Sequence, residues 1–170
     1  RGHSAILAPY LSREDRSDPA FLRFALVANW RMGTEEAARR VAAVAMDEGR
    51  PDALRTEAMR MIVEWELPSP VDPIHGAWFP LVPRDVTFLN DLATEMSASI
   101  TTAPDEVVRP WVQLAGVLKL RQLEPLMAEL CADTSRPGAT RAAALGALEA
   151  VFSAHYMPTV EAGIEDPDPV

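Results

Sequence analysis

Residues 105–118, DEVVRPWVQLAGVL, and residues 136–152, RPGATRAAALGALEAVF, share one arrangement. In each stretch an arginine near the start is followed by apolar residues that recur at helical spacing. This spacing predicts an amphipathic helix with one buried face. The residues expected on that face are Val108, Trp111, Val112, Ala115 and Leu118 in the first stretch and Ala144, Ala147, Leu148 and Val151 in the second.

Helical periodicity extends outward from these two stretches along most of the chain. It predicts further helices over residues 18–32, 34–46, 52–65, 89–100, 123–130 and 159–164. Asp18 and Thr34 are residue types that cap helix N-termini, and each stands at the start of a predicted helix. No segment shows the convincing apolar and polar alternation of a strand. The sequence therefore predicts an all-α fold.

Four arginines recur at similar places in the predicted helices: Arg23, Arg55, Arg109 and Arg141. Their separations are 32, 54 and 32 residues, and the longer gap equals one 32-residue period plus 22 extra residues. A helix-turn-helix period of this length is typical of solenoids. We expect each arginine to bond to an aspartate or to a helix-end carbonyl in an adjacent repeat, forming a structural ladder rather than a catalytic set.

The recurring pattern Asp/Pro-x-x-Val/Leu-Arg-x-x-Ala resembles HEAT repeats. The resemblance implies an α-α superhelix, a HEAT/ARM-like solenoid of about four helix pairs that spans residues 1–170. Tetratricopeptide repeats have a similar period, but their tryptophan, Leu-Gly and tyrosine positions are not matched. We expect the chain to be a piece of a longer protein, with residues 166–170, DPDPV, opening a fifth repeat.

Residues 67–85, LPSPVDPIHGAWFPLVPRD, interrupt the repeat with five prolines and one glycine, so no helix continues through them. Long irregular insertions are frequently functional. One interpretation is a docking surface for a neighbouring domain or another protein. The other, which we favour, is that Trp78 and Phe79 plug the groove between repeats while Arg84 and Asp85 cap the next helix. The candidate interaction residues are Asp72, His75, Trp78, Phe79, Arg84 and Asp85.

The run from Leu54 to Asp85 is similar to the HEAT-like region of very large planctomycete-type proteins. The shared features are Trp65, Pro68, Pro70, Asp72, Gly76, Trp78, Pro80, Arg84 and Asp85. The resemblance implies a parent in which this region spaces a dehydrogenase-like propeller and a cytochrome c domain. Haem c would then belong to the parent, since this chain holds no CxxCH. The parent would be a membrane-associated or exported, periplasmic dehydrogenase.

Composition and charge weigh against several function classes. The net charge of −9 opposes binding to nucleic acid. A single cysteine, Cys131, excludes an internal disulfide and a cysteine-built zinc site, and no apolar run is long enough for membrane insertion. We predict no catalytic, cofactor-binding or metal residue. The expected function is a non-catalytic scaffold that binds neighbouring domains or another protein. The alternative is a HEAT-like enzyme with a groove active site, of the lyase or glycosylase type.

Overall fold

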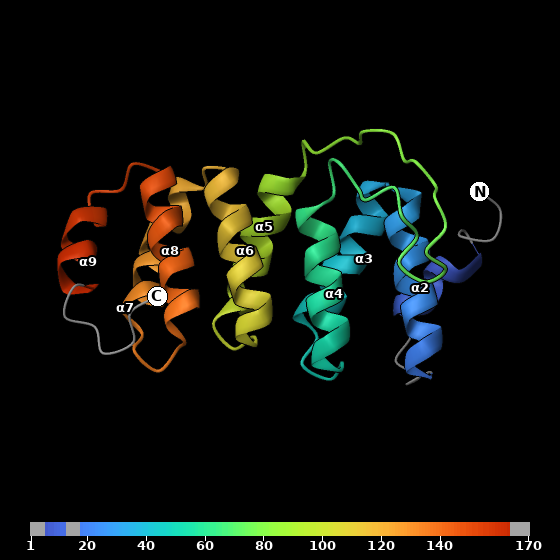
Figure 1. The fold of residues 1–170 in the computed structure, drawn as a ribbon, viewed down its shortest axis with the longest axis horizontal. Coiled ribbons are helices and arrows are strands. Elements are labelled where there is room, and N and C mark those ends of the chain that lie inside the picture. Colours follow the sequence, from blue (N-terminus) through green and yellow to red (C-terminus); the bar gives the residue numbers. More distant parts are fainter. Residues whose placement is uncertain (1–5, 13–17, 164–170) are drawn as a thin grey trace. The chain divides into compact units, whose positions relative to one another are not determined.

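The computed structural model describes residues 6–12 and 18–163, and its regular elements there are helices. The one β-type pairing within these residues is an isolated antiparallel bridge between Val71 and Trp78. The predicted all-α class is therefore confirmed. The helices form two compact units, Arg1–Phe88 and Leu89–Val170 (Figure 1). The predicted fifth repeat at residues 166–170 lies outside the described residues.

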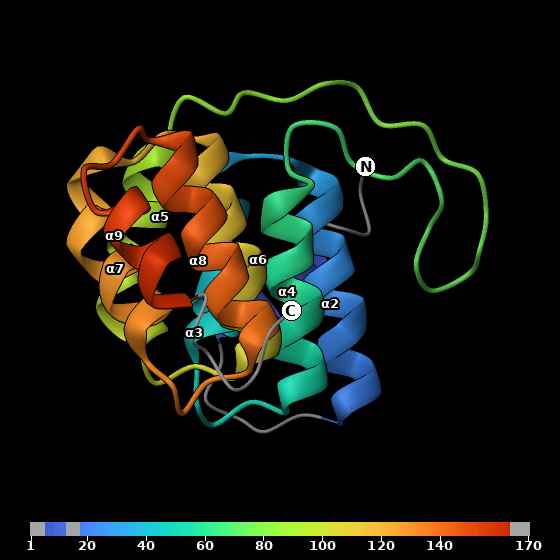
Figure 2. The same ribbon diagram turned by 60° about the vertical axis from the view of Figure 1, so that its left-hand side comes forward.

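The first unit contains η1 (Ala8–Ser12), α2 (Pro19–Met32), α3 (Glu35–Met46) and α4 (Asp52–Val63). The predicted caps form: the Asp18 carboxylate accepts the Ala20 N–H at 2.9 Å, and the Thr34 hydroxyl accepts the Ala37 N–H at 3.2 Å. Alanines on the buried face of α3 let α4 approach it closely, and α2 packs beside both helices (Figure 2). Trp65, which is 0% exposed, lies in the core of this unit.

The second unit contains α5 (Leu89–Ile100), α6 (Asp105–Val117), η2 (Arg121–Leu123), α7 (Glu124–Ala132), α8 (Gly138–Ala150) and α9 (Tyr156–Gly163). Trp111 is buried, and its indole N–H donates to the Ala93 carbonyl at 3.1 Å, which ties α6 to α5. Helix α8 packs on both α6 and α7. The last helix begins at Tyr156, three residues earlier than the predicted Thr159.

The contact between α6 and α8 depends on a glycine. A Cβ at Gly116 would lie 3.1 Å from the Cα of Ala147, so only glycine allows this approach without a shift of the backbone. The two helices are equivalent members of successive predicted hairpins, and their packing on each other is consistent with an α-α superhelix.

A long irregular segment, residues 64–88, joins α4 to α5, as the proline content predicts. Figure 1 shows it in green, and its first part lies beside α2 in the first unit. This segment carries all six candidate interaction residues. None of the helices among residues 6–12 and 18–163 has the length and apolar character required to cross a membrane.

Candidate interaction site

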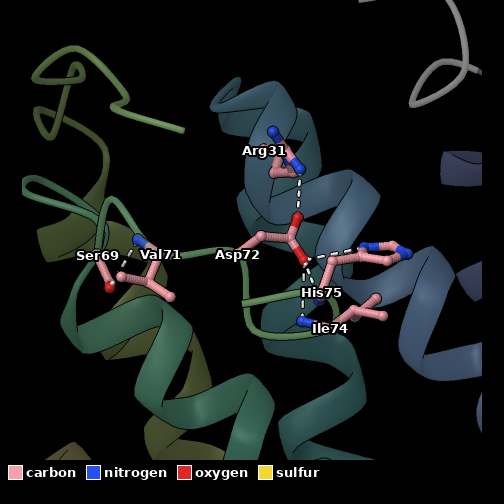
Figure 3. Close-up of polar contacts among 6 residues, drawn as sticks. All are labelled: Arg31, Ser69, Val71, Asp72, Ile74 and His75. Carbon is pink, nitrogen blue, oxygen red and sulfur yellow. Dashed lines mark hydrogen bonds and ion pairs between the residues drawn. The ribbon is translucent and has the colours of Figure 1, made fainter. Parts of the chain in front are cut away.

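The carboxylate of Asp72 is the centre of the loop's hydrogen bonding (Figure 3). Its side chain is buried, and Oδ1 accepts the backbone N–H groups of Ile74 and His75, each at 2.9 Å. The other oxygen pairs with the guanidinium of Arg31 on α2. One carboxylate therefore shapes the turn and also attaches it to a helix.

Backbone bonds close this turn into a small hairpin. The Asp72 N–H donates to the Ala77 carbonyl at 2.8 Å, and the Gly76 N–H donates back to the Asp72 carbonyl at 2.8 Å. Gly76 has a φ of 65°, in the left-handed region that favours glycine. The Phe79 N–H then donates to the Pro70 carbonyl at 2.6 Å. We call the segment from Pro70 to Phe79 the anchored hairpin.

Several groups set the charge state of Asp72. Burial acts to raise its pKa, but the hydrogen bonds from His75 and Ile74 and the positive charge of Arg31 outweigh burial, so the pKa lies below its ordinary value of 3.8. The carboxylate is therefore ionised at neutral pH. The His75 ring is 67% exposed, with Nδ1 at 3.3 Å from Asp72 Oδ1, and it also lies against the ring of Phe24.

A second arginine of α2 holds the same hairpin from another side. Arg23 Nη2 donates to the Pro73 carbonyl at 3.0 Å, while Arg23 Nε lies 2.9 Å from a carboxylate oxygen of Glu57 on α4. The hydrogen bond and the negative charge of Glu57 raise the pKa of Arg23 above its ordinary value. The hairpin is thus fixed to α2 at two points, by Arg31 and by Arg23.

The distal end of the segment is fixed by Arg84. Its guanidinium lies between two tryptophan rings, 5.5 Å from the centroid of Trp30 and 4.8 Å from that of Trp65. Burial lowers its pKa to about 10, and its two Nη atoms have no hydrogen-bond partner among the described residues. Gly33 makes room for this side chain, because a Cβ there would lie 2.8 Å from Arg84 Nε. The buried end of the Arg84 side chain therefore lies against two core tryptophans.

The two loop aromatics remain at the surface. Trp78 is 69% exposed and Phe79 is 50% exposed, with the Arg31 guanidinium 4.6 Å from the Phe79 ring centroid. The interpretation that Trp78 and Phe79 plug a groove between repeats is thus wrong, because both side chains are at least half exposed. The guanidinium of Arg84 lies against Trp30 and Trp65 and does not cap α5. Asp85 accepts the Thr87 N–H at 2.9 Å, ahead of the first residue of α5. We call the exposed side chains of Trp78, Phe79 and Val82 the loop face.

The four ladder arginines occupy two different environments. Arg55 and Arg141 are buried, and their Nε atoms donate to the carbonyls of Ala45 at 3.1 Å and Arg136 at 3.2 Å. Arg23 and Arg109 are exposed. The difference follows from helix register, since Arg55 and Arg141 are fourth in their helices whereas Arg23 and Arg109 are fifth. One residue turns a side chain by about 100° around the helix axis.

A nine-residue repeat that the sequence reasoning missed explains the buried pair. Residues 47–55, DEGRPDALR, and residues 133–141, DTSRPGATR, share the pattern D-x-x-R-P-x-A-x-R. In both copies the first arginine pairs with the aspartate three residues earlier: Arg50 with Asp47 at 3.0 Å, and Arg136 with Asp133 at 3.4 Å. Arg136 also pairs with Asp105 at 3.0 Å and so joins the loop before α8 to the first residue of α6. The recurrence itself was the signal available in the sequence.

Arg31 and Trp30 are the other residues that the sequence reasoning did not single out. Both lie at the end of α2, and no motif links them to a loop 41 residues later. Within the described ranges, no group of three or more His, Cys, Asp or Glu side chains could hold a metal ion. No protein-family model, no curated protein and no solved structure matches the chain.

Proposed function

We propose that this chain is a protein-interaction scaffold, in which the helical units carry the loop face and present it to a neighbouring domain or to a second protein. The observation that supports this proposal is that exposed aromatic side chains lie on an ordered part of the loop. Trp78 and Phe79 remain largely exposed on a hairpin that Arg31, Arg23 and Asp72 hold in place.

Exposed aromatic side chains on an ordered base favour binding for a physical reason. Aromatic residues and arginine dominate the binding energy of protein interfaces. A segment that is already ordered loses little conformational entropy when a partner covers it. The cation of Arg31 stacked on Phe79 further restrains that ring.

Site-specific photo-crosslinking in the full-length protein tests this proposal. Phe79→p-benzoylphenylalanine is compared with the same replacement at Phe152, which is 82% exposed in the second unit. We expect a discrete cross-link from position 79, to one other domain or protein, that position 152 does not give. Equal patterns from both positions, or no product from position 79, would refute the proposal.

The parent protein implied by the resemblance, with its propeller and cytochrome c domain, stays a prediction. A CxxCH motif downstream in the parent sequence would be the test of that assignment. Its outcome is independent of the cross-linking experiment, because the loop face is defined by residues of this chain alone.

A further inference from the structure

From the sequence, exposure and anchoring of the loop we infer that residues Phe79–Pro83, FPLVP, are a polyproline II ligand for a domain whose binding groove is lined by aromatic side chains. This inference rests on the proposed function and names the chemistry of the partner. It concerns a short extended stretch between two anchors, which we call the strap.

The sequence of the strap restricts the backbone of four of its five residues. The rings of Pro80 and Pro83 hold φ near about −65°. Phe79 and Val82 each precede a proline, which excludes most of the helical region and favours extended backbone. Leu81 is the single residue of the strap without such a restraint. The structure assigns neither helix nor strand to any of these five residues.

Both ends of the strap are attached to the first unit. At the start, the Phe79 N–H donates to Pro70 at 2.6 Å, and Trp78 pairs with Val71 in the isolated bridge. At the end, the Arg84 N–H donates to the Glu66 carbonyl at 3.3 Å, and the Arg84 guanidinium lies between two tryptophans. A partner therefore meets a strap whose ends are already positioned, and this lowers the entropic cost of binding.

Four of the five strap residues are exposed: Phe79, Pro80, Val82 and Pro83. A polyproline II helix has three residues per turn, so in that conformation Phe79 and Val82 share one edge, and Pro80 and Pro83 share another. Val82 is 77% exposed and Phe79 is 50% exposed, while both prolines are exposed. The Pro-x-x-Pro spacing on a solvated extended backbone is the form that aromatic-lined grooves recognise.

The absence of charged side chains in the strap restricts the kind of groove that can bind it. From Trp78 to Pro83 the chain carries no charged side chain, and the guanidinium of the next residue, Arg84, lies inward against Trp30 and Trp65. The partner groove must then gain its affinity from stacking and apolar contact with the strap. The strap could instead contact a second copy of this chain, and sedimentation experiments distinguish that case.

The test is a titration of purified SH3, WW and EVH1 domains, each labelled with ¹⁵N, with the 170-residue chain. We expect saturable shifts in the groove aromatics of at least one domain. Val82→Ala should weaken that binding roughly tenfold, because it removes two methyl groups from the contact. Val117→Ala is the matched control, since Val117 is 78% exposed on α6 of the other unit, and it should leave the affinity unchanged.

Three outcomes would overturn the inference. The first is that none of the three domains shows saturable shifts. The second is that both valine variants weaken binding equally. The third is that Val82→Ala abolishes self-association of the chain in sedimentation experiments. A cross-link at position 79 without binding to these domains defeats this inference and leaves the proposed function standing. The absence of a cross-link from position 79 in the full-length protein defeats the proposed function as well.

Discussion

The carboxylate of Asp72 and the guanidinium of Arg31 form an ion pair between the loop and α2, with the Asp72 side chain 3% exposed and that of Arg31 27% exposed. The pair joins residues 41 positions apart in the sequence. The same carboxylate orders the hairpin turn and the same guanidinium contacts Phe79, so the order of the loop face depends on this contact.

Asp72→Asn should therefore loosen the anchored hairpin. The amide keeps an acceptor for the turn N–H groups but loses the charge that faces Arg31. We expect a loss of about 1–2 kcal/mol in unfolding free energy by urea titration. Faster limited proteolysis between residues 67 and 85 should accompany it. Glu48→Gln, at an exposed position, is the control and should change neither measurement.

The stabilising effect of Asp72 should depend on pH in a defined direction. Its folded-state pKa lies below the ordinary value of 3.8, so the folded state favours the ionised form. The stability difference between wild type and Asp72→Asn should be complete near neutral pH and should vanish as the pH falls through the folded pKa, below 3.8. Urea titrations from pH 7 to pH 2 measure it; a difference that persists unchanged at pH 2 contradicts this assignment.

Arg84 should tolerate an apolar side chain of similar length. Its buried Nη atoms lack acceptors, so Arg84→Met loses the cation–π contacts but also removes the cost of burying a charge. The unfolding free energy of this variant should stay within about 1 kcal/mol of the wild-type value. Arg84→Ala empties the space between Trp30 and Trp65 and should cost about 2–3 kcal/mol. Thermal unfolding of the two variants checks this, and equal losses would show that the charge itself is required.

Gly116 and Gly146 should respond to alanine with opposite signs. At Gly116 the new Cβ meets the backbone of Ala147, and we expect a net loss of about 1 kcal/mol despite the better helix propensity. At Gly146 nothing lies within 4 Å of the added Cβ, so Gly146→Ala should gain about 0.5–1 kcal/mol. Chemical unfolding followed by circular dichroism measures both; stabilisation by Gly116→Ala would disprove the close approach.

The arginine register leads to a further comparison within the second unit. Arg141 is 6% exposed and donates to a backbone carbonyl, so Arg141→Ala should cost about 2 kcal/mol. Arg109 is exposed one helix position further on, and Arg109→Ala should change stability by less than about 0.5 kcal/mol. Equal costs would instead support a ladder in which all four arginines contribute alike.

Most of the helices were predictable because their determinants are local. Asp18 and Thr34 cap α2 and α3 as their residue types suggest, and Gly33 ends α2 with a φ of 70°. The loop over residues 67–85 was predictable for the opposite reason, since its five prolines cannot continue a helix. The candidate loop residues were identified as a group, but their individual positions were not.

The sequence by itself determined the helical class, the main helix boundaries and the place of the irregular loop, because hydrogen bonding and side-chain spacing within about one turn decide them. Only the tertiary structure decided that the end of the Arg84 side chain is buried while Trp78 is exposed, and that Arg31 meets Asp72. Those outcomes depend on which surfaces of α2 and α4 the loop covers. Packing between residues far apart in the chain settles that choice, and no local pattern encodes it.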